Sequence, residues 1–402
     1  MFCSYMRILI VTDVFPPGCD GSGWSTYYLC KALRSEGHDI IIITAKKGDV
    51  SIYDGFKVYN EGHRISELSF LKMRKRARIL ANKFDIVHAQ HAKSCRAIAP
   101  LKNIKKVCTI RDHWPLFYDG TKFDERKVRN LNRDNNILDT IRSIYSKDNV
   151  SLFVRIFSPP AGLYMVMRTY FSMSSLKKID NIICVSDYVR QTLLPHFDSK
   201  KLTVIHNMID FDSMSEIKTV DLSDKKNIVY LGKLNVPKGA LFFAKSLARL
   251  PSSVKEKLNI IFIGDGASKN KISKILDEST ICCEFKGYLE NQVALSIIKS
   301  SYAFVSTSLL NDTLSRSILE ACAMGTAVIA SNVGGTPEII QHEKNGLLYD
   351  VNSDELNNCI IKVVDDVKFR DKLAKNALIS VKKKFDYKVL IHEYEEYYNS
   401  LL

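Results

Sequence analysis

Several patterns that would place the chain in other classes of protein are absent from its sequence. The ten cysteines include no CxxC pair, and Cys282 and Cys283 are adjacent, so neither a zinc site nor a disulfide framework is indicated. No apolar run reaches the roughly 20 residues of a membrane-spanning helix, because arginines and prolines interrupt the nearest candidate, 150–173. The first residues lack the charged and apolar regions of a secretory signal. We therefore expect a cytoplasmic protein with reduced cysteines.

Length and composition favour two ordinary globular domains. The chain has 402 residues, more than one hydrophobic core usually supports. Hydrophobic residues make up 46% of it and the mean hydropathy is -0.08, values that exclude a disordered chain.

Positive charge is concentrated in one half of the chain. The net charge is +14; residues 1–205 hold 33 Lys and Arg against 19 Asp and Glu, whereas residues 206–402 hold 25 of each. A one-sided basic field suits nucleic acid or an anionic membrane surface. No zinc-finger spacing or RNP motif supports binding to nucleic acid. We expect no nucleic-acid partner and a peripheral contact of the N-terminal domain with an anionic membrane.

Buried strands alternate with helices twice along the chain. The first half predicts strands at 7–12, 39–44, 85–88, 106–110 and 181–185, with helices at 24–34 and 71–83. After 202–205 the pattern predicts strands at 227–231, 259–263 and 303–306, with helices at 240–250 and 269–276. This alternation is typical of doubly wound, Rossmann-like α/β domains. We expect one domain at 1–205 and a second at 206–384.

The segment 312–340, DTLSRSILEACAMGTAVIASNVGGTPEII, carries two acids and a Gly-Gly turn. Asp312 is placed to cap a helix that begins near Thr313, whose first-turn N–H groups would favour a phosphate. Glu320 follows within the same helix, about 12 Å away at ~1.5 Å per residue, so one sugar nucleotide could meet both acids. The alternative is a capped helix with an exposed Glu320, followed by a buried strand at 327–330.

This segment, extended to Asp350, resembles the signature of family 4 glycosyltransferases, retaining enzymes of the GT-B fold. Asp312 stands where that family has a first Glu, and Ala327 where Pro is usual. The resemblance implies two Rossmann-like domains facing a central cleft, with a last helix, 385–402, that returns to the first domain. It also implies a nucleoside diphosphate sugar as donor, and no metal or other cofactor.

Two loops of the second domain also resemble donor-binding segments of the family. One contains Lys233, where Arg is more usual, and Lys238. Fixed cations there would stabilise the charge that develops on the leaving diphosphate; the alternative is two solvated lysines. The other is the turn of Gly264, Asp265 and Gly266, expected beside the nucleotide base.

The resemblance assigns further donor contacts around the two acids. Asp312 would contact the sugar and Glu320 the ribose. The remaining expected donor-binding residues are Thr313, Leu314 and Ser315.

In the first domain, a loop between the first strand and the first helix contains Gly21, Ser22 and Gly23. It lies at the carboxyl end of a parallel sheet, where open α/β folds bind ligands, so we expect it to contact the donor or the acceptor. The resemblance adds three acceptor-side residues after the strand at 106–110, with Arg in place of the family's His: Arg111, Asp112 and Trp114.

Two pairs of residues superficially resemble metal sites. Asp210 and Asp212 form a DxD pattern, which we interpret as structural because it lies at the expected domain boundary. His88 and His91 lack an evident third ligand, so we expect a packed His88 and a solvated His91. No metal site is predicted.

A basic helix and an insertion indicate how an acceptor could be held. The helix at 71–84 places apolar residues on one face and five cations elsewhere: Met73, Ala77, Leu80 and Phe84 form the apolar face. The insertion at 119–178 begins polar and becomes aromatic and apolar. We hypothesise that both hold a lipid-linked or membrane-proximal acceptor.

The expected function is transfer of a sugar, with retention, from a nucleoside diphosphate sugar to a saccharide or lipid-linked acceptor, in cell-surface polysaccharide or glycolipid synthesis. One alternative is an inactive GT-B-like protein that binds a nucleotide sugar, indicated by the departures at Asp312, Lys233 and Arg111. The other is a sugar phosphorylase on the same fold.

Overall fold

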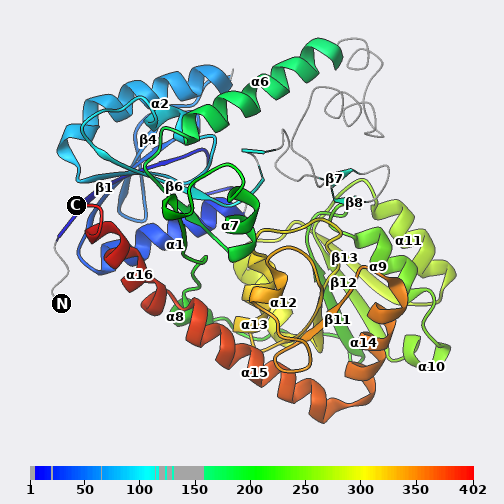
Figure 1. Cartoon of the computed structure of the whole chain (residues 1–402). Coiled ribbons are helices and arrows are strands. Elements are labelled where there is room, and N and C mark those ends of the chain that lie inside the picture. The colour runs from blue at the N-terminus through cyan, green and yellow to red at the C-terminus, as the bar shows by residue number, and fades with distance from the viewer. Residues whose placement is uncertain are drawn as a thin grey trace. The chain divides into compact units, whose positions relative to one another are not determined.

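The computed structural model of the protein describes residues 5–19, 21–64, 66–113, 115–116, 123–124, 129–130 and 158–402. The chain forms two compact units (Figure 1). Unit 1 comprises Met1–Lys122, Asn132–Met208 and Tyr387–Leu402, and unit 2 comprises Phe123–Leu131 and Ile209–Asp386. The chain therefore passes between the units after residues 122, 131, 208 and 386. The last two passages lie close to the boundaries predicted from the sequence, after 205 and 384.

Unit 1 is an α/β unit built on an eight-stranded sheet. Its strands are β1 Arg7–Thr12, β2 Asp39–Thr44, β3 Ser51–Tyr53, β4 Phe56–Asn60, β5 Ile86–Ala89, β6 Lys105–Ile110, β9 Asn181–Cys184 and β10 Leu202–Val204. Its helices are α1 Gly21–Ser35, α2 Ser66–Leu80, η1 Ala81–Lys83, α3 Cys95–Ile98, α6 Ser158–Leu176, α7 Asp187–Leu193, η2 Ser199–Lys201 and α16 Tyr387–Asn399.

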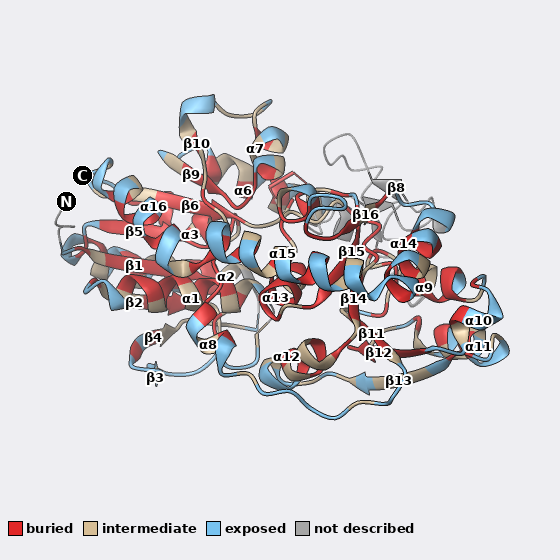
Figure 2. Cartoon of the chain, turned by 90° about the horizontal axis from the view of Figure 1, so that it is seen from below, coloured by how far each residue is buried: buried red, intermediate tan, exposed pale blue. Residues whose placement is uncertain are grey.

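The sheet of unit 1 has the strand order β10-β9-β6-β5-β1-β2-β4-β3, and all neighbours run parallel except β3 and β4. In the centre, Ile8 of β1 pairs with Ile40 of β2 and Ile86 of β5. Every residue of β5 is buried, as expected for a strand covered by helices on both faces. Figure 2 shows these strands as buried and the covering helices as exposed on their outer sides.

The last helix, α16, packs on unit 1 through aromatic residues. Tyr394 and Tyr398 are almost fully buried in the same cluster as Ile8 and Ile10 of β1. Two side-chain contacts fix its position: Nε2 of His38 lies 3.0 Å from Glu395 Oε1, and the Tyr398 hydroxyl lies 2.6 Å from Nδ1 of His88.

Unit 2 is a second α/β unit, built on a six-stranded sheet. Its strands are β11 Lys226–Leu231, β12 Leu258–Ile263, β13 Cys282–Gly287, β14 Ala303–Ser306, β15 Ala327–Ser331 and β16 Leu347–Tyr349, with β7 Phe123–Asp124 and β8 Arg129–Asn130 as a separate hairpin. Its helices are α8 Phe211–Ser215, α9 Ala240–Leu247, α10 Ser252–Lys255, α11 Lys269–Glu278, α12 Asn291–Ser300, α13 Arg316–Ala323, η3 Thr336–Glu338, α14 Ser353–Asp365 and α15 Val367–Phe385.

The sheet of unit 2 has the strand order β13-β12-β11-β14-β15-β16 and is parallel throughout. Because all strands run the same way, the loops that follow β11, β12, β14 and β15 meet at one edge of the sheet. The order reverses direction between β11 and β14, the point at which open α/β sheets bind ligands. The predicted class, two doubly wound α/β units, is confirmed.

Candidate functional site

The loop between β11 and α9 is held in one conformation by buried polar contacts. The hydroxyl of Tyr230 lies 3.1 Å from the carbonyl oxygens of both Lys233 and Lys238. Burial raises the pKa of this hydroxyl, and the nearby charge of Asp312 raises it further, so it remains a hydrogen-bond donor. Oδ1 of Asn235 accepts a hydrogen bond from the backbone N–H of Lys238 at 3.1 Å. The loop therefore presents both lysines from a fixed backbone.

Gly239 joins this loop to the one that follows β14. Its φ is +72°, a left-handed conformation that other residues rarely adopt, and a Cβ on it would lie 1.7 Å from the carbonyl oxygen of Thr307. The Thr307 hydroxyl, which is buried, donates a hydrogen bond to the Gly239 carbonyl at 3.0 Å. Only glycine allows the two loops to approach so closely.

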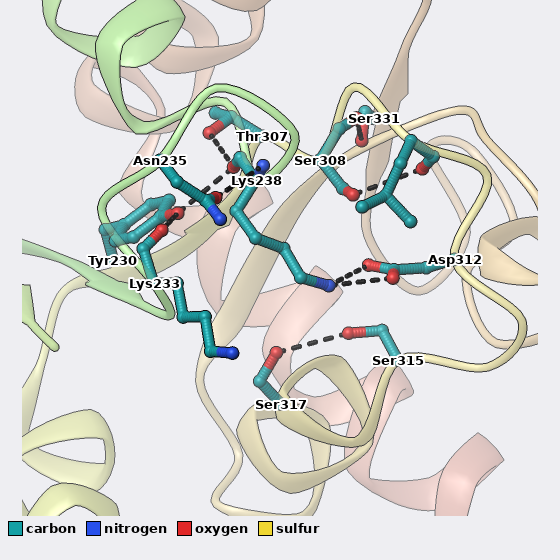
Figure 3. Close-up of polar contacts among 11 residues, drawn as sticks. Tyr230, Lys233, Asn235, Lys238, Thr307, Ser308, Asp312, Ser315, Ser317 and Ser331 are labelled. Carbon is teal, nitrogen blue, oxygen red and sulfur yellow. Dashed lines mark hydrogen bonds and ion pairs between the residues drawn. The ribbon is translucent and has the colours of Figure 1, made fainter. Parts of the chain in front are cut away.

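The same two loops are joined by an ion pair. Nζ of Lys238 lies 2.7 Å from Oδ1 and 2.8 Å from Oδ2 of Asp312 (Figure 3). The Asp312 carboxylate is largely shielded, and the Lys238 side chain is partly exposed. The backbone carbonyl of Asp312 also accepts a hydrogen bond from the N–H of Gly335 at 2.8 Å. Asp312 thus belongs to a network that spans the loops after β11, β14 and β15.

Lys233 differs from Lys238 in its surroundings. Its side chain is exposed, and among the described residues its ammonium makes no hydrogen bond or ion pair. Figure 3 shows it extending from the same loop as Lys238. The edge of unit 2 therefore carries one cation engaged with a carboxylate and one that faces solvent.

The helix that follows Asp312 begins later than expected. α13 starts at Arg316 with Ser315 as its N-cap, and Asp312 does not cap it. The prediction of a helix from Thr313 is wrong because the Asp312 carboxylate bonds to Lys238 and the segment up to Ser315 is not helical. The separation of about 12 Å, which assumed continuous helix, does not hold either. Leu314 is buried, and the hydroxyls of Ser315 and Ser317 lie 3.2 Å apart.

Glu320 is buried on α13, with 3% of its surface exposed, which rules out the alternative of an exposed Glu. Its Oε1 accepts a hydrogen bond from Nε of Arg316 at 2.9 Å, one turn earlier on the same helix. Nδ2 of Asn291 lies 3.4 Å from the same oxygen. The predicted buried strand after this helix is present as β15.

The Gly-Asp-Gly turn after β12 packs against the lysine loop. A Cβ on Gly264, whose φ is +126°, would lie 2.1 Å from the carbonyl oxygen of Gly232. Oδ1 of Asp265 accepts from the N–H of Gly266 at 2.7 Å, and the Asp265 carbonyl accepts from the N–H of Leu234 at 3.0 Å. The structure thus places Lys233, Lys238, Asp312 and the turn at 264–266 on neighbouring loops at one sheet edge, whereas Glu320 lies on the helix that follows, α13.

In unit 1, the glycine segment is helical rather than a loop. Gly21, Ser22 and Gly23 form the first turn of α1, which the sequence analysis started at Trp24. A Cβ on Gly23 would lie 2.5 Å from Sγ of Cys19, so this glycine is required for close packing with the preceding residues. The segment does follow β1, at the carboxyl end of the sheet.

Arg111 follows β6 and is held by two amides of unit 1. Its Nη2 donates to Oε1 of Gln90 at 2.7 Å, and its Nη1 donates to Oδ1 of Asn207. Asp112 is partly buried beside it, and Trp114 lies outside the described residues. The guanidinium is therefore fixed in direction by residues from the ends of β5 and β10.

The two pairs that superficially resembled metal sites have structural surroundings. Oδ1 of Asp210 caps α8 by accepting from the N–H of Ser213 at 3.0 Å. His88 is packed as expected, and burial followed by the charge of Arg111 lowers its pKa to about 3. His91, in the loop between β5 and α3, is buried, so the expectation of a solvated His91 is wrong. In the parts of the chain that are described, no three His, Cys, Asp or Glu residues are grouped to hold a metal.

Sequence reasoning missed several residues that shape these sites. Arg316 had a local signal, since it precedes Glu320 by one helical turn. Asn235 also had one, because an Asn side chain commonly bonds to a backbone N–H a few residues later, here that of Lys238. Gln90 and Asn207 had none, because each binds Arg111, which only the folded chain brings near.

Comparisons with known proteins identify the family of the chain. Residues 214–379 match the family "Glycosyl transferases group 1", and residues 19–213 match "Glycosyltransferase Family 4". An uncharacterized glycosyltransferase of Methanocaldococcus jannaschii, MJ1607, is 24% identical over 411 residues, covering 95% of both chains. A second from the same organism, MJ1069, is 27% identical over 234 residues, which span 56% of this chain and 60% of the relative.

Among solved structures, Anabaena Alr3699/HepE in complex with UDP-glucose has a TM-score of 0.70 at 16% identity, covering 99% of this chain and 100% of that one. At this identity the likeness shows the fold, which is GT-B. Together, the two family matches extend over residues 19–379. The chain belongs to the group 1 glycosyl transferases, enzymes of the GT-B fold that use nucleotide sugars.

Proposed function

We propose that the chain transfers a sugar from a nucleoside diphosphate sugar to a saccharide or lipid-linked acceptor, with retention of configuration and without a metal. The observation that carries this proposal is the gathering of Lys233, Lys238, Asp312 and the start of α13 at the carboxyl edge of the unit 2 sheet. A diphosphate needs fixed positive charge, and a sugar needs an oriented acceptor group. This edge offers both.

The contacts of Lys238 support a role at the diphosphate. Its ammonium has three N–H donors, and two face the oxygens of Asp312, which leaves one for a phosphate oxygen. Lys233, exposed on the same loop, would add a second cation. The first backbone N–H groups of α13 lack intrahelical acceptors and would favour the same anion.

Retention follows if the leaving group assists the acceptor. The bond between the anomeric carbon and the diphosphate oxygen breaks while the acceptor hydroxyl attacks the same face, and the departing phosphate oxygen takes the hydroxyl proton. Cations near that oxygen stabilise this transition state more than the bound donor, because negative charge grows there. Asp312 would orient the sugar, and Glu320, held by Arg316, would contact the ribose.

Unit 1 would supply the acceptor side. Arg111, fixed by Gln90 and Asn207, offers an oriented cation near the end of β6. With an excess of positive charge in the first half of the chain, an acceptor held at an anionic membrane, as in polysaccharide or glycolipid synthesis, fits this unit.

A thermal-shift panel of UDP, GDP and ADP sugars tests the donor site first. One of these should raise the melting temperature of the wild-type chain, and Glu320→Ala should abolish that shift. An unchanged shift in the variant would place the donor elsewhere. The product's anomeric configuration, determined by NMR, tests retention, and activity in EDTA tests independence from metal.

The same assays separate the alternatives. Binding without release of the nucleotide, even with varied acceptors, would identify a nucleotide-sugar-binding protein. Cleavage of a glycoside that depends on inorganic phosphate would identify a phosphorylase.

A further inference from the structure

Helix α6 of unit 1 carries a stripe of exposed apolar side chains. Within its described part, 163–176, the exposed side chains are large and apolar, with between 42% and 70% of their surface open: Leu163, Tyr164, Met167, Tyr170 and Phe171. Their spacing places them on one helical face. Among the described residues of the helix, Thr169, Ser172 and Leu176 are buried on the opposite side. The exposed stripe of large apolar side chains is suited to a second, apolar environment.

Helix α2 presents an outward stripe of mixed character. Six exposed residues, three aliphatic and three cationic, recur at helical spacing along one face: Leu68, Leu71, Lys72, Lys75, Arg78 and Ile79. The opposite face, with Met73 and Ala77, is buried on the sheet side. This combination of cations with aliphatic residues is typical of helices that lie in a membrane interface.

The two helices are tied together at one end. Glu67, at the start of α2, lies 3.2 Å from the hydroxyl of Tyr164 and 3.3 Å from Nε of Arg168, both on α6. It also pairs with Arg96 of α3, the helix on which both α2 and α6 pack. Figure 1 shows α2 and α6 side by side on unit 1. Their exposed stripes therefore lie on adjoining helices of unit 1, and we call the two stripes together the α2/α6 face.

The charge of this face selects its occupant. Glu67 is the only acid in either helix, and its charge is taken by two arginines. A complementary occupant must be anionic and apolar at once. The chain's own segment 117–157 carries eight Lys and Arg against six Asp and Glu, and a second copy of the chain has a net charge of +14, so neither is complementary.

We propose that the α2/α6 face docks on the surface of an anionic lipid bilayer. The α6 side chains enter the boundary between headgroups and acyl chains, where tyrosines with one apolar and one polar end are favoured, while Lys72, Lys75 and Arg78 meet the lipid phosphates. No helix of the described residues is long and apolar enough to cross a bilayer. This surface is distinct from the donor site in unit 2, so the proposal stands or falls separately from the transfer reaction.

Co-sedimentation of the full chain with vesicles tests the proposal. We expect binding to equimolar phosphatidylcholine and phosphatidylglycerol, and little binding to phosphatidylcholine alone. Replacing Lys72, Lys75 and Arg78 together by Gln should lower the partition coefficient on the order of a hundredfold, since each cation near an anionic surface contributes about fivefold. Tyr170→Ser with Phe171→Ser should lower it on the order of tenfold by removing apolar insertion.

A matched control changes the same charge elsewhere. Lys372, Lys375 and Lys382, exposed on α15 of unit 2, replaced together by Gln, should leave binding unchanged. The proposal is overturned if the wild type shows no preference for phosphatidylglycerol, or if the α15 variant loses as much binding as the α2 variant. Self-association in solution that Met167→Asp abolishes, without vesicle binding, would identify a second copy as the occupant instead. The donor-induced thermal shift should be the same in the α2 variant and the wild type.

Discussion

Gly239 offers a sharp test of how the lysine loop is held. A methyl group at this position would lie 1.7 Å from the carbonyl oxygen of Thr307, and the backbone would have to keep a φ of +72°. The left-handed conformation alone costs a residue with a Cβ about 1–2 kcal/mol. The overlap adds a further cost of about 1–3 kcal/mol, because a backbone carbonyl cannot turn aside as a side chain can. Gly239→Ala should therefore destabilise unit 2 by about 2–5 kcal/mol.

Gly287 supplies the matched control. Its φ is +64°, and a Cβ on it would meet nothing within 4 Å. Gly287→Ala should therefore cost only the conformational term, about 1–2 kcal/mol. The difference between the two variants isolates the contact between the β11 and β14 loops.

The two units can be followed separately in urea. Both tryptophans, Trp24 and Trp114, belong to unit 1, so tryptophan fluorescence reports that unit, while far-ultraviolet circular dichroism reports both. In urea, Gly239→Ala should move the unfolding transition seen by circular dichroism and leave the one seen by tryptophan fluorescence in place. The variant should also lose the rise in melting temperature caused by the donor, because Lys238 is the residue directly before Gly239. If Gly239→Ala is no less stable than Gly287→Ala, the loop contact described above does not hold the site.

Three further predictions concern the two sites. Lys238→Ala should weaken donor binding by about tenfold to a hundredfold, which corresponds to the loss of one charge-assisted hydrogen bond. Calorimetry measures this affinity, and Lys372→Ala is the control that should leave it unchanged. If Lys238→Ala binds the donor as tightly as the wild type, Lys238 does not contact the diphosphate. Burial holds the pKa of His88 at about 3, below its ordinary value near 6.5, so between these pH values the unfolded chain binds a proton that the folded chain does not. The stability of unit 1 should therefore fall as the pH drops from 6.5 towards 3, by up to about 1.4 kcal/mol per pH unit. Urea denaturation followed by tryptophan fluorescence should show this slope in the wild type and a smaller slope in His88→Gln. Gln90→Leu removes one partner of Arg111 and should raise the KM for the acceptor on the order of tenfold while donor affinity stays constant; a matching loss of donor affinity would indicate a general structural defect instead.

The sequence predicted central strands well because their burial is continuous. β12 is buried along its whole length, Leu258–Ile263, and its apolar run is visible without knowledge of the fold. The strands that were missed lie towards the sheet edges. β4 alternates buried Phe56 and Val58 with exposed Lys57, and β13 is mostly exposed or half-buried, so neither gives a continuous apolar run.

The start of α13 was mispredicted for a different reason. Local sequence places Asp312 as a helix cap, but the bond that fixes its carboxylate comes from Lys238, 74 residues earlier in the chain. No local rule reveals a competitor at that separation. The pairing of Arg316 with Glu320 is one helical turn long and was open to prediction. Arg111, in contrast, is oriented by Gln90 and Asn207, which are 21 and 96 residues away.

The pairing of Lys238 with Asp312 links the two halves of the proposed donor contact. A carboxylate has about four acceptor positions, and Lys238 occupies one on each oxygen, so Asp312 can still accept from a sugar hydroxyl without releasing the lysine. Each partner then orients the other: Asp312 directs the remaining N–H of Lys238, and Lys238 fixes the oxygens of Asp312. The charges of Lys238 and Asp312 nearly cancel at long range, so the exposed Lys233 supplies most of the long-range attraction for an approaching diphosphate. Lys233 should therefore govern the salt dependence of donor association, and the Lys238–Asp312 pair its geometry.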